Sequence, residues 1–258
     1  MMTGITDPGC VRDINEDAYL ISTESRLAVL ADGMGGHLAG EVASAIAVEV
    51  VTRELARVIE RLTNRPEGSE VPSITGALAT AIVAANRAIF QAAREKPECE
   101  GMGTTVVVAL LYGGKLYAGH VGDSRLYRLR AGALTQLTED HSMVQEMIRR
   151  GFITPEEARA SASKNLVTRA LGVESQVEPD VAEHDCDSED LFFLCSDGVT
   201  DVLTDAEIES ALASRLADPE HALARMVEEV NRRGGPDNIT AILIRVGNGG
   251  KPAAAMNS

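Results

Sequence analysis

Apolar residues in the first third of the chain predict one buried strand followed by two long helices. Residues 27–31 are continuously apolar, as expected of a strand inside a core. Residues 39–62 carry apolar side chains at helical spacing. Residues 74–94 do the same, and Ser73 is a suitable N-cap for that helix. The segment 63–72 between them contains two prolines and predicts a loop.

Two pairs of apolar segments follow, each interrupted by a short turn that contains glycine. The pairs are 104–112 with 115–121, and 125–130 with 134–137. Turns of this kind between apolar segments predict β-hairpins. We expect the four strands to pair in sequence order and to form one β-meander.

The second half of the chain mixes helical segments with two further strands, and no internal repeat or second domain is apparent. Strands and helices do not alternate one for one, which argues against a parallel sheet. The pattern favours an α+β fold, an antiparallel β-sandwich flanked by pairs of helices. The predicted helices are 141–150, 155–161, one that begins at 204–207, and 221–233, and the predicted strands are 191–195 and 239–246.

Composition narrows the classes of partner. The 258 residues carry a net charge of −15, which argues against nucleic acid and anionic membranes as partners. The longest apolar stretch, 106–112, is too short to cross a bilayer, and the N-terminus lacks the features of a signal peptide, so we expect a cytoplasmic protein. The four cysteines are scattered and predict neither a zinc site nor a disulfide scaffold. The tail 247–258 is expected to be disordered.

Acidic residues beside glycine or asparagine recur from one end of the chain to the other, many at the ends of predicted strands. Strand ends are places where distant parts of a chain converge. Carboxylates that converge repel one another and are costly to bury unless cations neutralise them. Because every candidate ligand is an oxygen, the pattern predicts hard ions such as Mg²⁺ or Mn²⁺. The acids are Glu16, Asp17, Asp32 (followed by Gly33), Asp123, Asp197 and Asp237.

Each of these motifs has an ordinary alternative when it is taken alone. An Asp-Gly pair is a common turn. Arg12 could hold a phosphate with two parallel hydrogen bonds, or pair on the surface with Asp13 or Glu16. His37 ends a glycine-rich turn, where it could donate a proton to a leaving group or be an exposed bystander.

Seven short motifs occur together in a fixed order. With them, residues 3–246 resemble the PPM (PP2C-type) metal-dependent serine/threonine protein phosphatases, in their bacterial form. A single motif of this kind carries little weight, but seven in the family's order are hard to obtain by coincidence. The motifs are Gly9 with Arg12 and Asn15-Glu16-Asp17, Asp32–Gly36, Gly101–Thr105, Gly122–Arg125, Thr168–Gly172, Ser196–Gly198 and Asp237–Thr240.

The resemblance implies one phosphatase domain over residues 1–246, with a small helical flap inserted at about 139–165 near a two-metal centre. It also assigns metal ligands. The implied ligands are Asp32, Asp197 and Asp237 for a first ion; Asp32, the Gly33 carbonyl and Glu16 for a second, with Asp17 close by through water; and Asp123 with Asp197 for a third, weaker ion.

Metal chemistry suggests how such a centre would hydrolyse a phosphoester. Two ions about 3.5–4 Å apart can share a water, lower its pKa and present it for in-line attack on phosphorus. Arg12 would orient the phosphoryl oxygens. Many eukaryotic relatives have a histidine directly after the Asp-Gly pair, where it is proposed as the general acid. Met34 occupies that position here, and His37 is the candidate replacement.

The leading hypothesis is an Mn²⁺- or Mg²⁺-dependent phosphatase of phosphoserine and phosphothreonine proteins, which opposes a bacterial serine/threonine kinase. A catalytically inactive scaffold that binds phosphoproteins is one alternative, although such a protein would normally have lost ligand acids. A hydrolase of small phosphoesters is the other, because the same metal centre would serve it.

Overall fold

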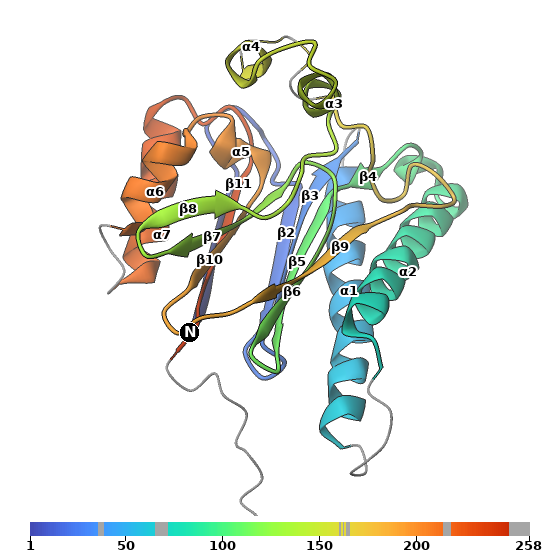
Figure 1. The fold of residues 1–258 in the computed structure, drawn as a ribbon. Coiled ribbons are helices and arrows are strands. Elements are labelled where there is room, and N and C mark those ends of the chain that lie inside the picture. Colours follow the sequence, from blue (N-terminus) through green and yellow to red (C-terminus); the bar gives the residue numbers. More distant parts are fainter. Residues whose placement is uncertain are drawn as a thin grey trace, which may run out of the picture.

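Two antiparallel β-sheets pack face to face between layers of helices in the computed structural model (Figure 1). This arrangement confirms the predicted α+β sandwich. The structure describes residues 1–35, 39–64, 72–159, 161, 163, 166–213 and 218–247.

The first sheet has five strands in the order β1-β11-β10-β7-β8. The second has the order β2-β3-β5-β6-β9, with the short β4 paired to β3. The strands of the first sheet are β1 Met2–Asp7, β7 Arg125–Arg130, β8 Ala133–Gln136, β10 Leu191–Cys195 and β11 Ile239–Arg245. Those of the second are β2 Asp17–Ser22, β3 Leu27–Met34, β4 Gly103–Thr104, β5 Val106–Tyr112, β6 Lys115–Val121 and β9 Asp180–Asp185.

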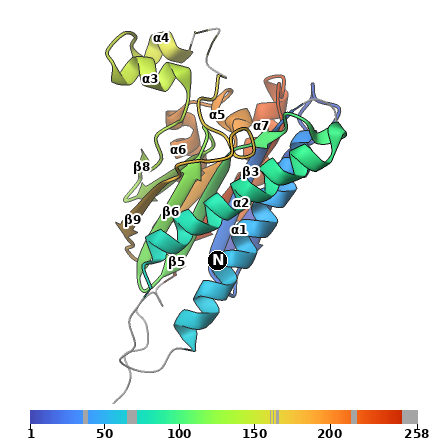
Figure 2. The ribbon, with the colours of Figure 1, turned by 90° about the vertical axis from the view of Figure 1, so that its right-hand side faces the viewer.

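Helices cover the outer face of each sheet. Figure 2 shows the long α1 Ala39–Thr63 and α2 Ile74–Glu95 side by side over the second sheet. On the other side, α6 Asp205–Ala213 and α7 Pro219–Arg232 cover the first sheet. The short α3 Met143–Arg149 and α4 Pro155–Arg159 stand at one end of the sandwich (Figure 1). The chain also forms η1 Pro97–Cys99 and α5 Asp197–Thr200.

The core has three apolar layers, one between the sheets and one under each pair of helices. Between the sheets, Leu30 and Leu116 meet Phe192, Leu194 and Ile242, all of them fully buried. Central strands therefore have both faces inside the protein, which is why their sequences are continuous apolar runs rather than alternating ones.

The expected β-meander is wrong. β5 and β6 form a hairpin in the second sheet, whereas β7 and β8 form a hairpin in the first, so the chain changes sheet after β6. The reason is burial: Leu116 of β6 and Leu126 of β7 pack into the same inter-sheet layer, which requires the two hairpins to face each other.

Both long helices are confirmed to within a residue, including the N-cap, where Ser73 Oγ accepts the N–H of Gly76 at 3.1 Å. The sequence patterns gave no indication of β1, β2 or β9. α2 is long and apolar enough to cross a membrane by length and composition, but its apolar side chains Leu78, Ile82 and Ile89 lie in the core against α1 and the second sheet.

Candidate metal centre

Asp32 reaches the site from inside the second sheet. β3 continues past the predicted strand end to Met34, so Asp32 and Gly33 are strand residues. Its antiparallel partner on β2 is Asp17, which places two carboxylates next to each other at one end of the sheet. Two threonines fix the backbone there: Thr105 Oγ1 accepts the Asp32 N–H at 3.1 Å, and Thr104 Oγ1 donates to the Asp32 carbonyl at 2.7 Å.

Asp197 and Asp237 reach the same end from the first sheet. Asp197 follows β10 and opens the one-turn helix α5, while Asp237 lies just before the adjacent strand β11. Ser196 joins the two sheets, because its Oγ donates to Asp17 Oδ2 at 2.8 Å and accepts the Thr240 N–H at 3.0 Å.

Asn238 holds the N-terminal loop in place. Its Oδ1 accepts the Glu16 N–H at 2.8 Å, and its Nδ2 donates to the carbonyls of Pro8 and Ile14 at 3.0 and 2.9 Å. The close packing also requires Gly198, since a Cβ at that position would overlap the Asn238 carbonyl oxygen.

The predicted acids share one electrostatic field. Burial raises the pKa of Asp32 well above its usual range, and the charges of Asp17, Asp197, Asp123 and Asp237 raise it further. Asp197 shows the same behaviour: burial is again the first cause, followed by the charges of neighbouring aspartates, Asp123 first. Burial also raises the pKa values of Asp17 and Asp123 to about 6. Without cations, this cluster can be accommodated only by taking up protons.

Two buried oxygens of the cluster have no hydrogen-bond partner among the described residues. They are Glu16 Oε1 and Asp17 Oδ1. Buried polar atoms are nearly always paired, so unpaired carboxylate oxygens on two adjacent residues call for a ligand. The donors are all oxygen, from carboxylates and the adjacent backbone, and this set fits a hard divalent cation.

Arg12 lies at the rim of the cluster. Its Nη2 donates to Asp237 Oδ2 at 2.7 Å, and the side chain is 51% exposed. The contact with Asp237 raises the pKa of the guanidinium. The alternative partners Asp13 and Glu16 form no ion pair with Arg12 among the described contacts. Arg12 therefore neutralises one of the candidate ligand acids from the solvent side.

Asp123 lies in the turn that carries the chain from β6 to β7, and only 8% of the residue is exposed. The candidate general acid His37 lies outside the described residues.

A cavity of about 440 Å³ opens beside the carboxylates. Its lining includes Asp123 and Asp197 together with residues of α3 and α4, among them Val144 and Ile148. A group bound at the carboxylates would therefore lie beneath the predicted flap.

Sequence reasoning missed Ser196 and Asn238 as organisers of the site. Both belong to recognised motifs, Ser196–Gly198 and Asp237–Thr240, but they hold Asp17 and Glu16, which are 179 and 222 residues away in the chain. Sequence position alone gives no sign of such contacts.

Comparison with known proteins gives a consistent result. The sequence model described as protein phosphatase 2C matches residues 12–243. Serine/threonine protein phosphatase PstP of Mycobacterium tuberculosis is 39% identical over 241 residues, which make up 93% of this chain and 44% of PstP. The chain thus spans less than half the length of that relative. Serine/threonine phosphatase stp of Listeria innocua is 37% identical over 242 residues, 93% of each chain.

Solved structures show the same likeness in three dimensions. The crystal structure of M. tuberculosis PstP/Ppp is 38% identical and has a TM-score of 0.84, with 96% of this chain and 99% of that one covered. A structure of the PstP catalytic domain in complex with two manganese ions is 38% identical, with a TM-score of 0.80 and coverage of 95% and 98%.

Proposed function

The chain belongs to the protein phosphatase 2C family of serine/threonine phosphatases, and we propose that it hydrolyses phosphoserine and phosphothreonine in proteins with the help of divalent metal ions. The observation that carries the proposal is the carboxylate cluster with its two buried, unpaired oxygens, Glu16 Oε1 and Asp17 Oδ1. Burying unpaired carboxylate oxygens costs free energy, and a scaffold without metal-dependent catalysis would gain nothing in return.

The ligand assignment follows the resemblance to the phosphatase family, and the convergence of both sheets on these acids supports it. Besides burial, the pKa of Asp32 is raised by the charges of Asp17 on its own sheet and of Asp197 and Asp237 from the other. We assign Asp32, Asp197 and Asp237 to one ion, and Asp32, Glu16 and the Gly33 carbonyl to a second, with Asp17 behind them. When bound, a pair of such ions lowers the pKa of a water and places it in line with the phosphorus atom.

Arg12 supplies phosphate recognition in this proposal. Its guanidinium is half exposed and is held by a single carboxylate, Asp237. Ions at the cluster would take over the neutralisation of Asp237 and release Arg12 to bind the phosphoryl oxygens bidentately. His37 remains our candidate for the proton donor to the leaving group, because it follows the glycine turn after Asp32.

The identity and number of the ions belong to the proposal. Oxygen donors suit both Mn²⁺ and Mg²⁺. After burial, the charge of Asp123 is the largest cause that raises the pKa of Asp197, and both residues line the same cavity, which supports a third, weaker ion between them.

We further propose that the substrates are proteins phosphorylated by a serine/threonine kinase of the same cell. The cavity of about 440 Å³ beside Asp123 is larger than a phosphate group requires and is open to the region of α3. A peptide segment on either side of a phosphoresidue could be accommodated there.

The test is release of phosphate from a phosphothreonine peptide, with Mn²⁺ and with EDTA, by the wild-type protein and by Asp32→Asn. Manganese-dependent release, lost in the variant and in EDTA, is the expected result. p-Nitrophenyl phosphate and a nucleoside monophosphate serve as small esters. Efficient hydrolysis of these esters without hydrolysis of the peptide would favour the small-phosphoester alternative, and no release by metal-loaded wild-type protein would favour the scaffold.

A further inference from the structure

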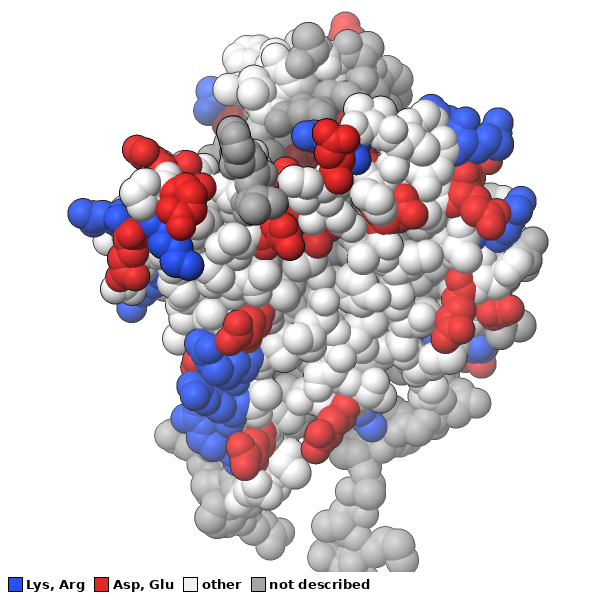
Figure 3. Space-filling view, turned by 180° about the vertical axis from the view of Figure 1, so that it is seen from behind, with Lys and Arg blue, Asp and Glu red and all other residues white. Residues whose placement is uncertain are grey.

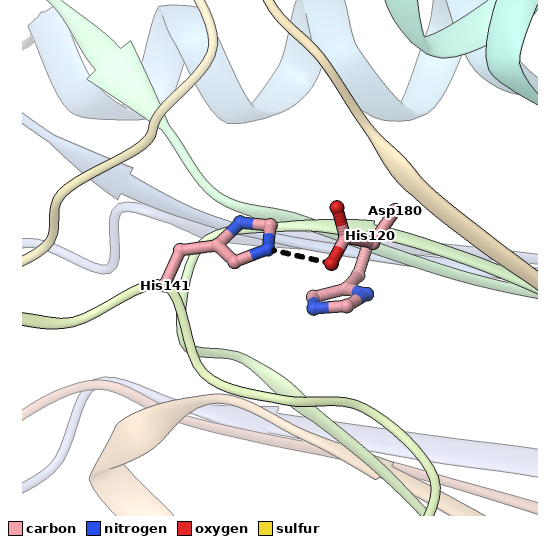
Figure 4. Close-up of side chains that lie close together, drawn as sticks. All are labelled: His120, His141 and Asp180. Carbon is pink, nitrogen blue, oxygen red and sulfur yellow. Dashed lines mark ion pairs between the residues drawn. The ribbon is translucent and has the colours of Figure 1, made fainter. Parts of the chain in front are cut away.

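A second group of chemically active side chains lies just outside the carboxylate cluster. Figure 4 shows His120 of β6, His141 of the flap entry and Asp180 of β9 close together. One ligand atom from each lies within 4.8 Å of the other two, and the two imidazole rings stack with centroids 4.6 Å apart. Two histidines and a carboxylate are suitable ligands for a transition metal.

The hydrogen bonds assign the group a different role. The backbone N–H of Gly122 donates to Nδ1 of His141 at 3.1 Å, so Nδ1 carries the lone pair and the proton of the neutral ring is on Nε2. Nε2 faces Oδ2 of Asp180 at 3.3 Å and makes no aligned hydrogen bond among the described residues. A metal would need a lone pair on that nitrogen. The protonated Nε2 is instead attracted by the carboxylate.

His120 completes the surroundings of the ring. Its Nε2 lies 2.8 Å from the Glu139 carbonyl, which can only accept, so this histidine donates there. Burial lowers the pKa of both histidines, in keeping with two neutral rings in contact. His120 therefore supports the position of the His141 ring from one side.

His141 holds Gly122 through both of its peptide groups. Besides the Nδ1 contact, the His141 N–H donates to the Gly122 carbonyl at 2.9 Å. Gly122 has φ +108°, and a Cβ at that position would lie 2.6 Å from the side chain of Thr105, so no other residue suits this backbone conformation. Asp123, the candidate ligand of the third ion, is the next residue.

His141 also belongs to the stem of the flap, by which we mean the two paired segments 141–142 and 167–169. Its carbonyl accepts the Thr168 N–H at 2.7 Å, and Ser142 forms an antiparallel bridge with Val167, so the outgoing and returning strands of the flap are paired at this point. On the returning strand, Arg169 donates to the other oxygen of Asp180, Oδ1, at 2.9 Å and fixes the carboxylate that faces His141.

We propose that His141 is a positioning residue that couples the flap stem to the metal-binding carboxylate of Asp123, with Asp180 and Arg169 setting the orientation and tautomer of its ring. The proposal rests on the proposed function, in which Asp123 holds an ion. A movement of the flap stem would be transmitted through His141 to the Gly122-Asp123 turn, and hence to the affinity for that ion.

A pair of polar substitutions separates this role from simple packing. In His141→Asn the side-chain oxygen can take the place of Nδ1 and accept the Gly122 N–H. In His141→Gln the polar group lies further out, near the place of Nε2, and leaves that N–H without an acceptor. His184→Gln on β9 is the matched control, because His184 has no described contact with Gly122 or with the flap.

Two readouts are measured on each variant. Hydrogen exchange of the Gly122 amide in the metal-free protein reports the hydrogen bond, and calorimetric titration with Mn²⁺ reports the ions. We expect His141→Gln to raise the exchange rate and to weaken the weakest Mn²⁺ site, each by about five- to tenfold. His141→Asn and His184→Gln should stay within about twofold of wild type in both readouts.

The proposal is overturned if folded His141→Gln exchanges and binds Mn²⁺ like wild type, or if His141→Asn is equally impaired. A third measurement needs no variant: ring nitrogen chemical shifts of wild-type His141 should show the Nε2–H tautomer, and an Nδ1–H tautomer would contradict the assignment. Failure of the wild-type protein to hydrolyse any phosphopeptide would count against the proposed function alone, because hydrogen exchange and ring shifts do not depend on turnover.

Discussion

At the scale of single residues, the surroundings of Asp17 act on its pKa in opposite directions. Ser196 donates a hydrogen bond to Oδ2, which favours the charged form, while burial and the neighbouring Asp237 favour the neutral one. Oδ1 keeps no hydrogen-bond partner among the described residues. Such a residue is destabilising at neutral pH until a cation arrives.

This conflict gives a pH-dependent prediction for the metal-free protein. The pKa of Asp17 is about 6 when folded and 3.8 when unfolded, so its stabilising contribution is complete below about 3.8 and is lost as pH rises through about 6. In EDTA, Asp17→Asn should therefore melt higher than wild type at pH 7.5, and this advantage should shrink by pH 5.

Wild type and Asp17→Asn must be compared with each other, because wild type alone also reports its histidines. Burial lowers the pKa of His120, His141 and His184, so their contribution to stability is lost as pH falls, opposite to that of Asp17. Those histidines are the same in both proteins and cancel from the difference. Calorimetric melting temperatures at both pH values make the test. An equal difference at pH 7.5 and pH 5 would show that Asp17 does not titrate as described.

Arg12 offers a second prediction at this scale. Arg12→Ala removes the guanidinium that we propose as the phosphate ligand, and it also frees Asp237 from its ion pair. We expect the KM for a phosphothreonine peptide to rise about tenfold or more, while the Mn²⁺ concentration for half-maximal activity does not increase. Steady-state kinetics is the measurement, and Arg12→Lys is the control that keeps the positive charge but loses the bidentate geometry. A large fall in kcat at unchanged KM would place the action of Arg12 in the transition state instead.

The acids themselves could be predicted from the sequence because each stands in a short motif with glycine or asparagine. Their supports could not. Ser196 and Asn238 act through partners brought close only by the packing of two sheets, and Asn238 resembles any asparagine before a strand.

At the scale of elements, the site is built where strand ends of two sheets meet. β2 and β3 bring Asp17 and Asp32, and the ends of β10 and β11 bring Asp197 and Asp237. The predicted β-meander is wrong because the chain builds two sheets that face each other, and the site lies where these two sheets meet. A hairpin signal fixes which strands pair locally, but burial of Leu116 and Leu126 in one layer decides that the two hairpins lie on opposite sheets.

The close packing of Gly198 in α5 against the backbone of Asn238 gives a third prediction. Gly198→Ala would bring a Cβ onto the backbone carbonyl of Asn238, next to two candidate ligand acids. Overpacking of this kind costs about 1–3 kcal/mol, so we expect a lower unfolding free energy together with weaker Mn²⁺ binding. Gly76→Ala near the start of α2, where a Cβ meets only Ser73 at 3.3 Å, is the control and should be neutral or slightly stabilising. Equal effects from both substitutions would contradict the account.

At the scale of the whole molecule, charge favours the capture of cations. The net charge is −15, and on the face shown in Figure 3 acidic side chains run across the upper part, below the flap. A field of this sign raises the local concentration of divalent ions and should be screened by salt. We expect the apparent Mn²⁺ affinity to fall several-fold between about 0.05 and 0.5 M KCl. An affinity that does not depend on salt would mean that the surface charge has no part in metal binding.

Manganese titration by calorimetry, on wild-type protein and on Asp197→Asn at pH 7.5, is the most direct test of the central claim. Asp197 lines the cavity and comes from the sheet opposite Asp32, so the claim that both sheets build one metal centre depends on it. The account predicts at least two Mn²⁺ ions in the wild type and the loss of at least one in the folded variant. Wild-type protein that binds no Mn²⁺, or a variant that binds it as wild type does, would contradict the account.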